Sequence, residues 1–164
     1  MPRRVKQLTI RTLIGLSCAL ISVVIIQAAL SPWYLFGLNI DDSLPGTIYL
    51  VIRDELPSRH DVAAFRTPPN PYYPEGVPFI KIVRGLPGDQ VSREGRVFSI
   101  NRQIIGIAKT RTRHGQPLTL GPTGKLPLDH YFFWTPHHDS YDSRYGEIGW
   151  ITTDRLLGRA VRLL

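Results

Sequence analysis

A long stretch without charge near the N-terminus constrains this chain more than any other feature. No Asp, Glu, Lys or Arg occurs from Thr12 to Ile40. Its most apolar part, Leu13 to Leu30, would form a helix of roughly 27 Å, which nearly matches the ~30 Å hydrocarbon core of a bilayer. No other segment of the chain looks helical enough to surround such a helix in a soluble protein. We therefore predict a helix that spans a membrane.

The residues on either side of this stretch predict its orientation. Four of the 20 basic residues and no acidic residue precede it, and aromatic residues follow at positions 33, 34 and 36. Positive flanking charge favours the cytoplasmic side, and aromatic residues favour the interface. We expect a cytoplasmic N-terminus over 1–11, an anchor over 12–36 and an extracytoplasmic domain over 37–164. A cleaved signal peptide is the alternative, since "QAALS" would serve as a cleavage zone.

Charge and cysteine content exclude several classes of protein. The formal net charge is +7, but much of the excess lies before the apolar stretch, so the main domain is only mildly basic. We expect the lipid bilayer, and not nucleic acid, as the partner of this charge. The only cysteine is Cys18, which excludes an internal disulfide and a cysteine-cluster metal site. We predict neither a metal nor a cofactor.

The rest of the chain is typical of a mainly β, antiparallel domain. Expected strands lie at 47–52, 61–65, 79–83, 130–134 and 159–164, with a small meander over 90–107 that turns near Gly95 and Asn101. "LPGD", from Leu86 to Asp89, predicts a type II turn with glycine at its third position. A loop with five prolines, 66–78, separates two of these strands.

Lys81 lies within an apolar run, "FIKIV". Side chains alternate along a strand, so Phe79 and Val83 share the face of Lys81, while Ile80 and Ile82 cover the other face. A buried ammonium is costly unless it is paired, and burial lowers the pKa of a lysine. Lowering it from ~10.4 to near 7 corresponds to about 4 kcal/mol. Lys81 is therefore either a candidate base or a side chain whose amine reaches solvent.

Ser43 is the candidate nucleophile. It follows the apolar stretch closely, and Pro45 and Gly46 predict a turn directly after it. Such a turn can leave backbone N–H groups available to an oxyanion. A serine needs a base to become a good nucleophile, and a neutral lysine can act as that base. Without Lys81, a serine in this setting would be read as an ordinary turn residue.

The segment "SYDSRYG", Ser140 to Gly146, contains two hydroxyl groups, a carboxylate and a guanidinium. Asp142 and Arg144 would share a strand face and could form an ion pair that fixes the segment. A serine hydroxyl here could orient the lysine amine. The alternative is a polar surface loop whose ion pair contributes less than about 1 kcal/mol.

These three segments together resemble the signal peptidase family, peptidase family S26, over residues 39–159. "FIKIVRGLPGD" is similar to the lysine box of that family, and "SYDSRYG" followed by "DRLLGRA" is similar to its C-terminal box. "SLPGTIY" looks like the nucleophile box, with one residue between Ser43 and Pro45 where ordinary type I signal peptidases have two. This shorter form, with Tyr49, most resembles the TraF-type peptidases of conjugative transfer, which mature pilin precursors.

The resemblance implies a fold, a reaction and roles for individual residues. The fold would be a signal-peptidase-like antiparallel β domain behind one transmembrane helix, in the inner membrane of a bacterium. Ser43 would be the nucleophile, with its N–H in the oxyanion hole, and Lys81 the general base. Ser140 would orient Lys81, while Asp142 and Arg144 brace the site. The substrate would be a translocated precursor with small residues before the cut, delivered by secretion or conjugation machinery.

Other interpretations stay open at this point. A general type I signal peptidase has the same chemistry, and the acyl-enzyme could end in hydrolysis or in cyclisation. A histidine triad would need one of the five histidines near Ser43. "HHD", His137 to Asp139, invites a metal site, although neighbours on a strand point to opposite faces. A membrane-tethered binding module without catalysis could use the basic segment 109–115.

Overall fold

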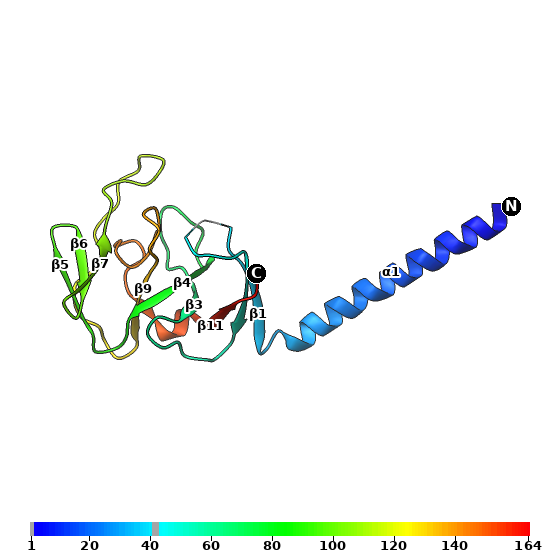
Figure 1. Cartoon of the computed structure of the whole chain (residues 1–164), viewed down its shortest axis with the longest axis horizontal. Helices are drawn as coiled ribbons and strands as arrows, with labels where there is room; N and C mark the ends of the chain where they lie inside the picture. The colour runs from blue at the N-terminus through cyan, green and yellow to red at the C-terminus, as the bar shows by residue number, and fades with distance from the viewer. Residues whose placement is uncertain (1, 41–42) are drawn as a thin grey trace. The chain divides into compact units, whose positions relative to one another are not determined.

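The computed structural model describes residues 2–40 and 43–164, and it divides into two compact units, 1–34 and 35–164. The first unit contains one continuous helix, α1 (Pro2–Leu30), labelled in Figure 1. Its segment Arg11–Leu30 is long and apolar enough to cross a membrane, with a mean hydropathy of 2.4. A signal sequence near the N-terminus has the same length and composition.

The helix ends earlier than the expected anchor. Pro32 disfavours helical geometry at the residue before it, and Trp33 N–H donates to Leu30 O at 3.0 Å in a closing turn. The aromatic residues that follow enter a strand, β1 (Tyr34–Leu38), instead of extending the helix. Aromatic residues after an apolar run are compatible with the interfacial end of a membrane helix and with a β-strand. Over 31–36 the chain leaves the helix and enters β1, which differs from the expected anchor.

The described part of the second unit is mainly β, with antiparallel pairing at each of its registers, as the sequence predicts. A seven-stranded sheet has the order β1-β2-β11-β3-β4-β9-β10, and a four-stranded sheet has the order β7-β6-β5-β8. The remaining elements are β2 (Ile48–Ile52), β3 (Val62–Arg66), β4 (Pro78–Gly85), β5 (Gln90–Glu94), β6 (Val97–Ile100), β7 (Gln103–Ile107), β8 (Gly124–Lys125), β9 (His130–Trp134), β10 (Ile151–Thr152), a 3-10 turn (Thr153–Arg155) and β11 (Leu156–Arg162).

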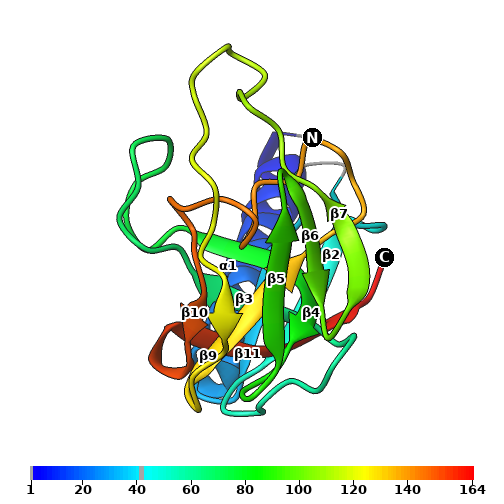
Figure 2. The same ribbon diagram turned by 90° about the vertical axis from the view of Figure 1, so that its left-hand side faces the viewer.

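The expected turns and meander are present. Gly88 has φ +90°, and Asp89 N–H donates to Leu86 O at 3.0 Å, as a type II turn requires. This turn connects the large sheet to the small one. Figure 2 shows β5, β6 and β7 side by side, with the loop 108–118 (yellow-green) projecting away from them.

Apolar side chains pack on both faces of β4. Ile80 belongs to a buried cluster with Tyr49 and Val51, whereas Val83 belongs to another with Phe65 and Phe133. A strand that is covered on both faces reads as a continuous apolar run. This packing is the setting of the lysine in the middle of β4.

Candidate active site

Lys81 is held at the centre of β4 by antiparallel pairing. Its register partner is Ala63 on β3, which is fully buried. The side chain of Phe79, two residues earlier, places its ring centroid 5.6 Å from Lys81 Nζ. Lys81 is 3% exposed. The alternative in which its amine reaches solvent is therefore wrong, because the neighbouring strands and side chains cover the amine.

Ser43 begins the short loop that leads to β2, and the loop is tied down by side chains. Asn39 Nδ2 donates to Leu44 O at 2.8 Å and to Gly46 O at 3.0 Å. Tyr49 O–H donates to Pro45 O. Gly46 has φ +92°, and a Cβ there would lie 2.5 Å from Leu164 O. Only glycine fits this position without displacement of the backbone.

The two predicted residues meet directly. Lys81 Nζ lies 2.7 Å from Ser43 Oγ, and Ser43 is 4% exposed. A lysine amine and a serine hydroxyl at hydrogen-bonding distance, both shielded from bulk water, can exchange a proton. Burial disfavours a charged amine in general, which is the property that a base at neutral pH requires.

Asp142 and Arg144 form a buried bidentate ion pair, in a turn and not on the predicted strand. Arg144 Nε and Nη2 donate to the two carboxylate oxygens at 2.9 Å each. Burial by itself would lower the pKa of Arg144, but the hydrogen bonds and charge of Asp142 outweigh it and hold that pKa above its ordinary value. Arg144 Nη1 also donates to Ile107 O at 2.9 Å. The surface-loop alternative is therefore wrong.

Ser140 lies in the same region, with a contact pattern that differs from the expectation. It is 3% exposed, and its Oγ has no hydrogen-bond partner among the described residues. Its carbonyl accepts from Arg144 Nη2 at 3.3 Å. Orientation of Lys81 by the Ser140 hydroxyl stays a prediction, since the structure holds that hydroxyl near the site without the expected bond.

A cavity of about 420 Å³ opens beside Ser43. Ser43 and Ser140 both line it, together with the aromatic residues Tyr72, Tyr73, Tyr141 and Tyr145 and with residues of the loop 108–118. The tyrosine rings pack on one another, with centroids 5.6 to 5.8 Å apart for three of the pairs. The cavity therefore has an aromatic wall beside Ser43.

Asp139 holds the loop 108–118 against the turn that carries Ser140. It accepts from Lys109 Nζ and, at 2.8 Å, from Arg113 Nε. The hydrogen bonds from Lys109 and Arg113 lower the pKa of Asp139 to about 2. The sequence predicts a basic segment that is free to bind a partner, and it predicts neither the role of Asp139 in holding this loop nor the brace at Asn39. Their spacing from Ser43 in the sequence gives no signal of either contact.

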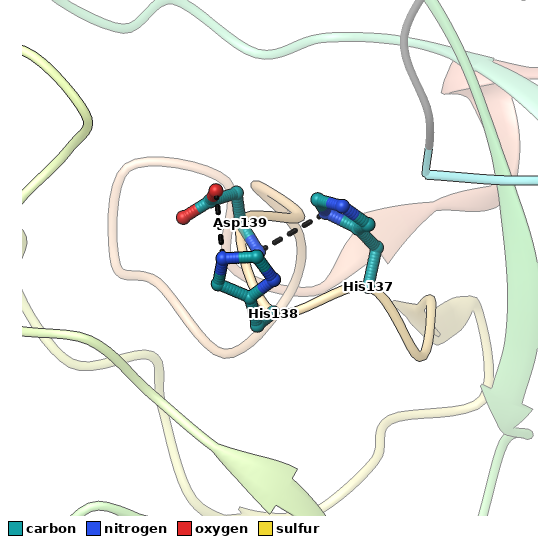
Figure 3. A group of neighbouring side chains, drawn as sticks. All are labelled: His137, His138 and Asp139. Atoms are coloured by element: carbon teal, nitrogen blue, oxygen red, sulfur yellow. Dashed lines mark hydrogen bonds and ion pairs between the residues drawn. The ribbon is translucent and has the colours of Figure 1, made fainter.

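The three residues of "HHD" come together in a turn, so the strand argument against a shared ion does not apply. Figure 3 shows that Asp139 contacts both histidines: its backbone N lies 3.2 Å from His137 Nδ1, and its carboxylate lies 3.0 Å from His138 Nε2. Their candidate ligand atoms lie within 4.8 Å of one another. The carboxylate is already bonded to two cationic side chains, however, which oppose the binding of a metal cation.

An antiparallel β domain with a buried serine–lysine contact, open to a cavity, defines a class of protein that can perform serine-based acyl transfer. The family model for signal peptidases, peptidase S26, matches residues 8–164. The chain therefore belongs to the signal peptidase family, whose members are serine peptidases. This confirms the family that the three sequence segments predict.

Among solved structures, the crystal structure of a signal peptidase I from Enterococcus faecalis V583 is similar to this chain. The two are 25% identical, and the match covers 64% of this chain and 97% of that chain with a TM-score of 0.43. No curated protein sequence matches the chain.

Proposed function

We propose that this protein is a membrane-anchored serine endopeptidase that uses Ser43 as nucleophile and Lys81 as general base. The observation that carries the proposal is the 2.7 Å contact between Lys81 Nζ and Ser43 Oγ, inside a packed sheet and beside a cavity. Family membership supports the reaction class, and the contact supports the assignment of these two residues within it.

The reaction follows from the two groups. Neutral Lys81 accepts the proton of the Ser43 hydroxyl while Oγ attacks the scissile carbonyl carbon. The tetrahedral oxyanion then collapses, and Lys81 donates its proton to the leaving amine, which yields an ester between Ser43 and the precursor. Lys81 next takes a proton from water, whose oxygen attacks the ester. Ser43 regains its proton, and the cleaved product leaves.

The surrounding residues have supporting roles in this proposal. The N–H of Ser43 contributes to stabilisation of the oxyanion. The ion pair between Asp142 and Arg144 keeps the segment from 140 to 146 rigid, because both groups are buried and bonded to one another. Ser140 moves its hydroxyl toward Lys81 when substrate fills the cavity, which would satisfy an Oγ that has no partner among the described residues.

The proposed substrates are translocated precursors with small residues before the cut. An anchor with a cytoplasmic N-terminus would put Ser43 on the outer side of the membrane, where such a precursor emerges. The single residue between Ser43 and Pro45 favours a TraF-type peptidase of conjugative pilin maturation over a general signal peptidase. The mass of the product distinguishes hydrolysis from cyclisation, since a cyclic product lacks one water.

The test compares Ser43→Ala and Lys81→Met in the purified full chain. Methionine fills the volume of the lysine stem without a base, so the strand should stay packed. We expect Ser43→Ala to abolish cleavage of a precursor and Lys81→Met to lower kcat at least about a hundredfold. Lys125→Met, at an exposed residue of β8, is the matched control and should cleave normally. Cleavage by Lys81→Met at the wild-type rate would remove the lysine from the mechanism.

A further inference from the structure

A second cavity, of about 190 Å³, shares no lining residue with the cavity of Ser43. It lies between the segment before β3, the end of β4 and the turn from β6 to β7. Its polar lining consists of Arg59, His60, Arg84, Asn101 and Gln103, and Ile100 and Ile105 form its apolar wall. Neither the proposed peptidase reaction nor the family assignment gives these residues a role.

The cavity has more positive charge than its acidic partner can neutralise. Arg59 is paired with Asp89 at 2.7 Å. The same carboxylate accepts from Asn101 Nδ2 at 2.7 Å and from the N–H of Leu86 at 2.7 Å. Asp89 is therefore fully engaged, and these bonds outweigh its burial and lower its pKa. Arg84 makes no ion pair among the described residues, so its charge is uncompensated.

Arg84 and His60 both line the cavity and contact one another. Arg84 Nη1 lies 3.2 Å from His60 Nδ1. A guanidinium can only donate, so Nδ1 must accept and the imidazole proton must lie on Nε2. The Arg84 guanidinium also lies over the ring of Trp134, with its carbon 5.2 Å from the centroid. The contacts fix the arginine while its remaining N–H groups stay available.

The backbone at this cavity is unusual as well. His60 has φ +74° and Arg102, next to Asn101 and Gln103, has φ +71°. A side chain in this conformation costs about 1–2 kcal/mol relative to the common conformations. Asn101, at φ +49°, is a residue that tolerates it. Histidine and arginine therefore occupy positions where glycine would be less strained. His60 lines the cavity, whereas Arg102 lies beside two lining residues and is not itself part of the lining.

We propose that this cavity binds a phosphate-type oxyanion, held by the guanidinium of Arg84, the Nε2–H of His60 and the amide of Gln103. Guanidinium groups match the oxygens of phosphate and donate two parallel hydrogen bonds to them. The same chemistry is offered by free inorganic phosphate and by the phosphate group of an anionic lipid. The binding is independent of the peptidase reaction.

Inorganic phosphate is the first probe, added to the full chain in a neutral detergent, with sodium chloride at equal ionic strength as the reference. We expect a saturable rise in Tm of ~2–4 °C, and slower amide hydrogen exchange in segments 57–61 and 100–104. Arg84→Gln and His60→Asn should lose both effects, and asparagine keeps the backbone conformation accessible at position 60. Arg93→Gln, on exposed β5 and outside the cavity, is the matched control and should respond like the wild type.

Nanodiscs identify the source of the phosphate group. Protection of the two segments in discs with phosphatidylglycerol, but not in discs of phosphatidylcholine alone, would assign the site to an anionic lipid. Protection by added phosphate in both kinds of disc would assign it to the free anion. An equal rise in Tm for Arg84→Gln, His60→Asn and the wild type would reflect general salt stabilisation and would overturn the proposal, as would the absence of protection in every arm.

Discussion

Asp142 and Arg144 show how strongly one buried pair can determine the structure around it. Each group would be costly to bury alone, and the carboxylate also lies 3.4 Å from the backbone N–H of Thr135 and 3.2 Å from that of Arg144. The pair therefore joins the end of β9 to the segment that carries Ser140. The pair keeps these two segments connected, since removal of either partner would leave the other charge buried and unpaired.

The neutral variant Asp142→Asn tests this connection. We expect it to lower the free energy of unfolding by about 3–5 kcal/mol, because Arg144 would stay buried without a counter-charge. Asp54→Asn is the matched control, since Asp54 is exposed and asparagine also tolerates its φ of +59°. Denaturant unfolding of both variants measures the difference. A loss below about 1 kcal/mol for Asp142→Asn would mean that the buried ion pair stabilises the fold no more than a surface ion pair does.

The residues that sequence reasoning found, and those it missed, differ in how local their signals are. Lys81 was recognisable because its four neighbours in the chain are apolar and alternate across a strand. Its meeting with Ser43 depends on the pairing of strands, which the sequence left undetermined, and the family resemblance supplied it. Asn39 bonds carbonyl groups of an irregular turn, and Asp139 bonds side chains that are distant in the sequence, so no period or motif predicts either set of contacts.

At the scale of elements, the loop between Ser43 and β2 depends on Gly46. Gly46→Ala should lower both activity and Tm, because its Cβ would lie 2.5 Å from the Leu164 carbonyl as well as strain a φ of +92°. Gly76→Ala separates the two effects, since Gly76 has φ +78° but nothing within 4 Å of an added Cβ. Kinetics and thermal unfolding on both variants give the comparison. Equal losses would show that strain alone, and not the close approach, matters at Gly46.

The loop 108–118 provides a prediction about pH. The pKa of Asp139 is lowered to about 2, so its bonds with Lys109 and Arg113 stabilise the fold above the ordinary carboxyl pKa and are lost as the pH falls toward 2. The wild type should therefore have a higher Tm than Asp139→Asn at neutral pH. The margin should shrink below about pH 4. A margin that persists at pH 2 would exclude charge as its origin.

Element prediction succeeded for most strands of four residues or more and failed for the two-residue strands and for β1. The period of two and the flanking turns located β2, β3, β4 and β9, and the meander from β5 to β7 was confirmed. β8 and β10 have two residues each, too few for any period, and exist because neighbouring strands provide partners. The sequence predicts the interfacial end of the anchor where β1 lies, because aromatic residues suit both a strand and a membrane interface.

At the scale of the whole molecule, the distribution of charge and the apolar helix carry the argument for membrane attachment. The helix segment Arg11–Leu30 has side chains that are exposed in the structure. So much apolar surface is unfavourable in water. Family membership and this segment together indicate anchoring, whereas the retained anchor and its orientation are predictions. They decide on which side of the membrane Ser43 would meet a precursor.

A retained anchor makes predictions that a cleaved signal peptide does not. The protein isolated from membranes should have the mass of the full chain and should resist extraction with alkaline carbonate. In spheroplasts, external protease should digest the domain over 37–164. The positive charge before the helix keeps the N-terminus in the cytoplasm, so the domain lies outside. Leu20→Arg, near the centre of the helix, should reduce insertion, since a central arginine costs about 2.5–3.5 kcal/mol. Ala29→Arg is the matched control, because an arginine near the helix end can reach the interface.

A mature chain that begins shortly after Ala29 would establish cleavage, and a domain protected in spheroplasts would reverse the orientation. Either result would separate the serine–lysine site from its proposed position at the outer membrane surface, without altering the contact between the two residues.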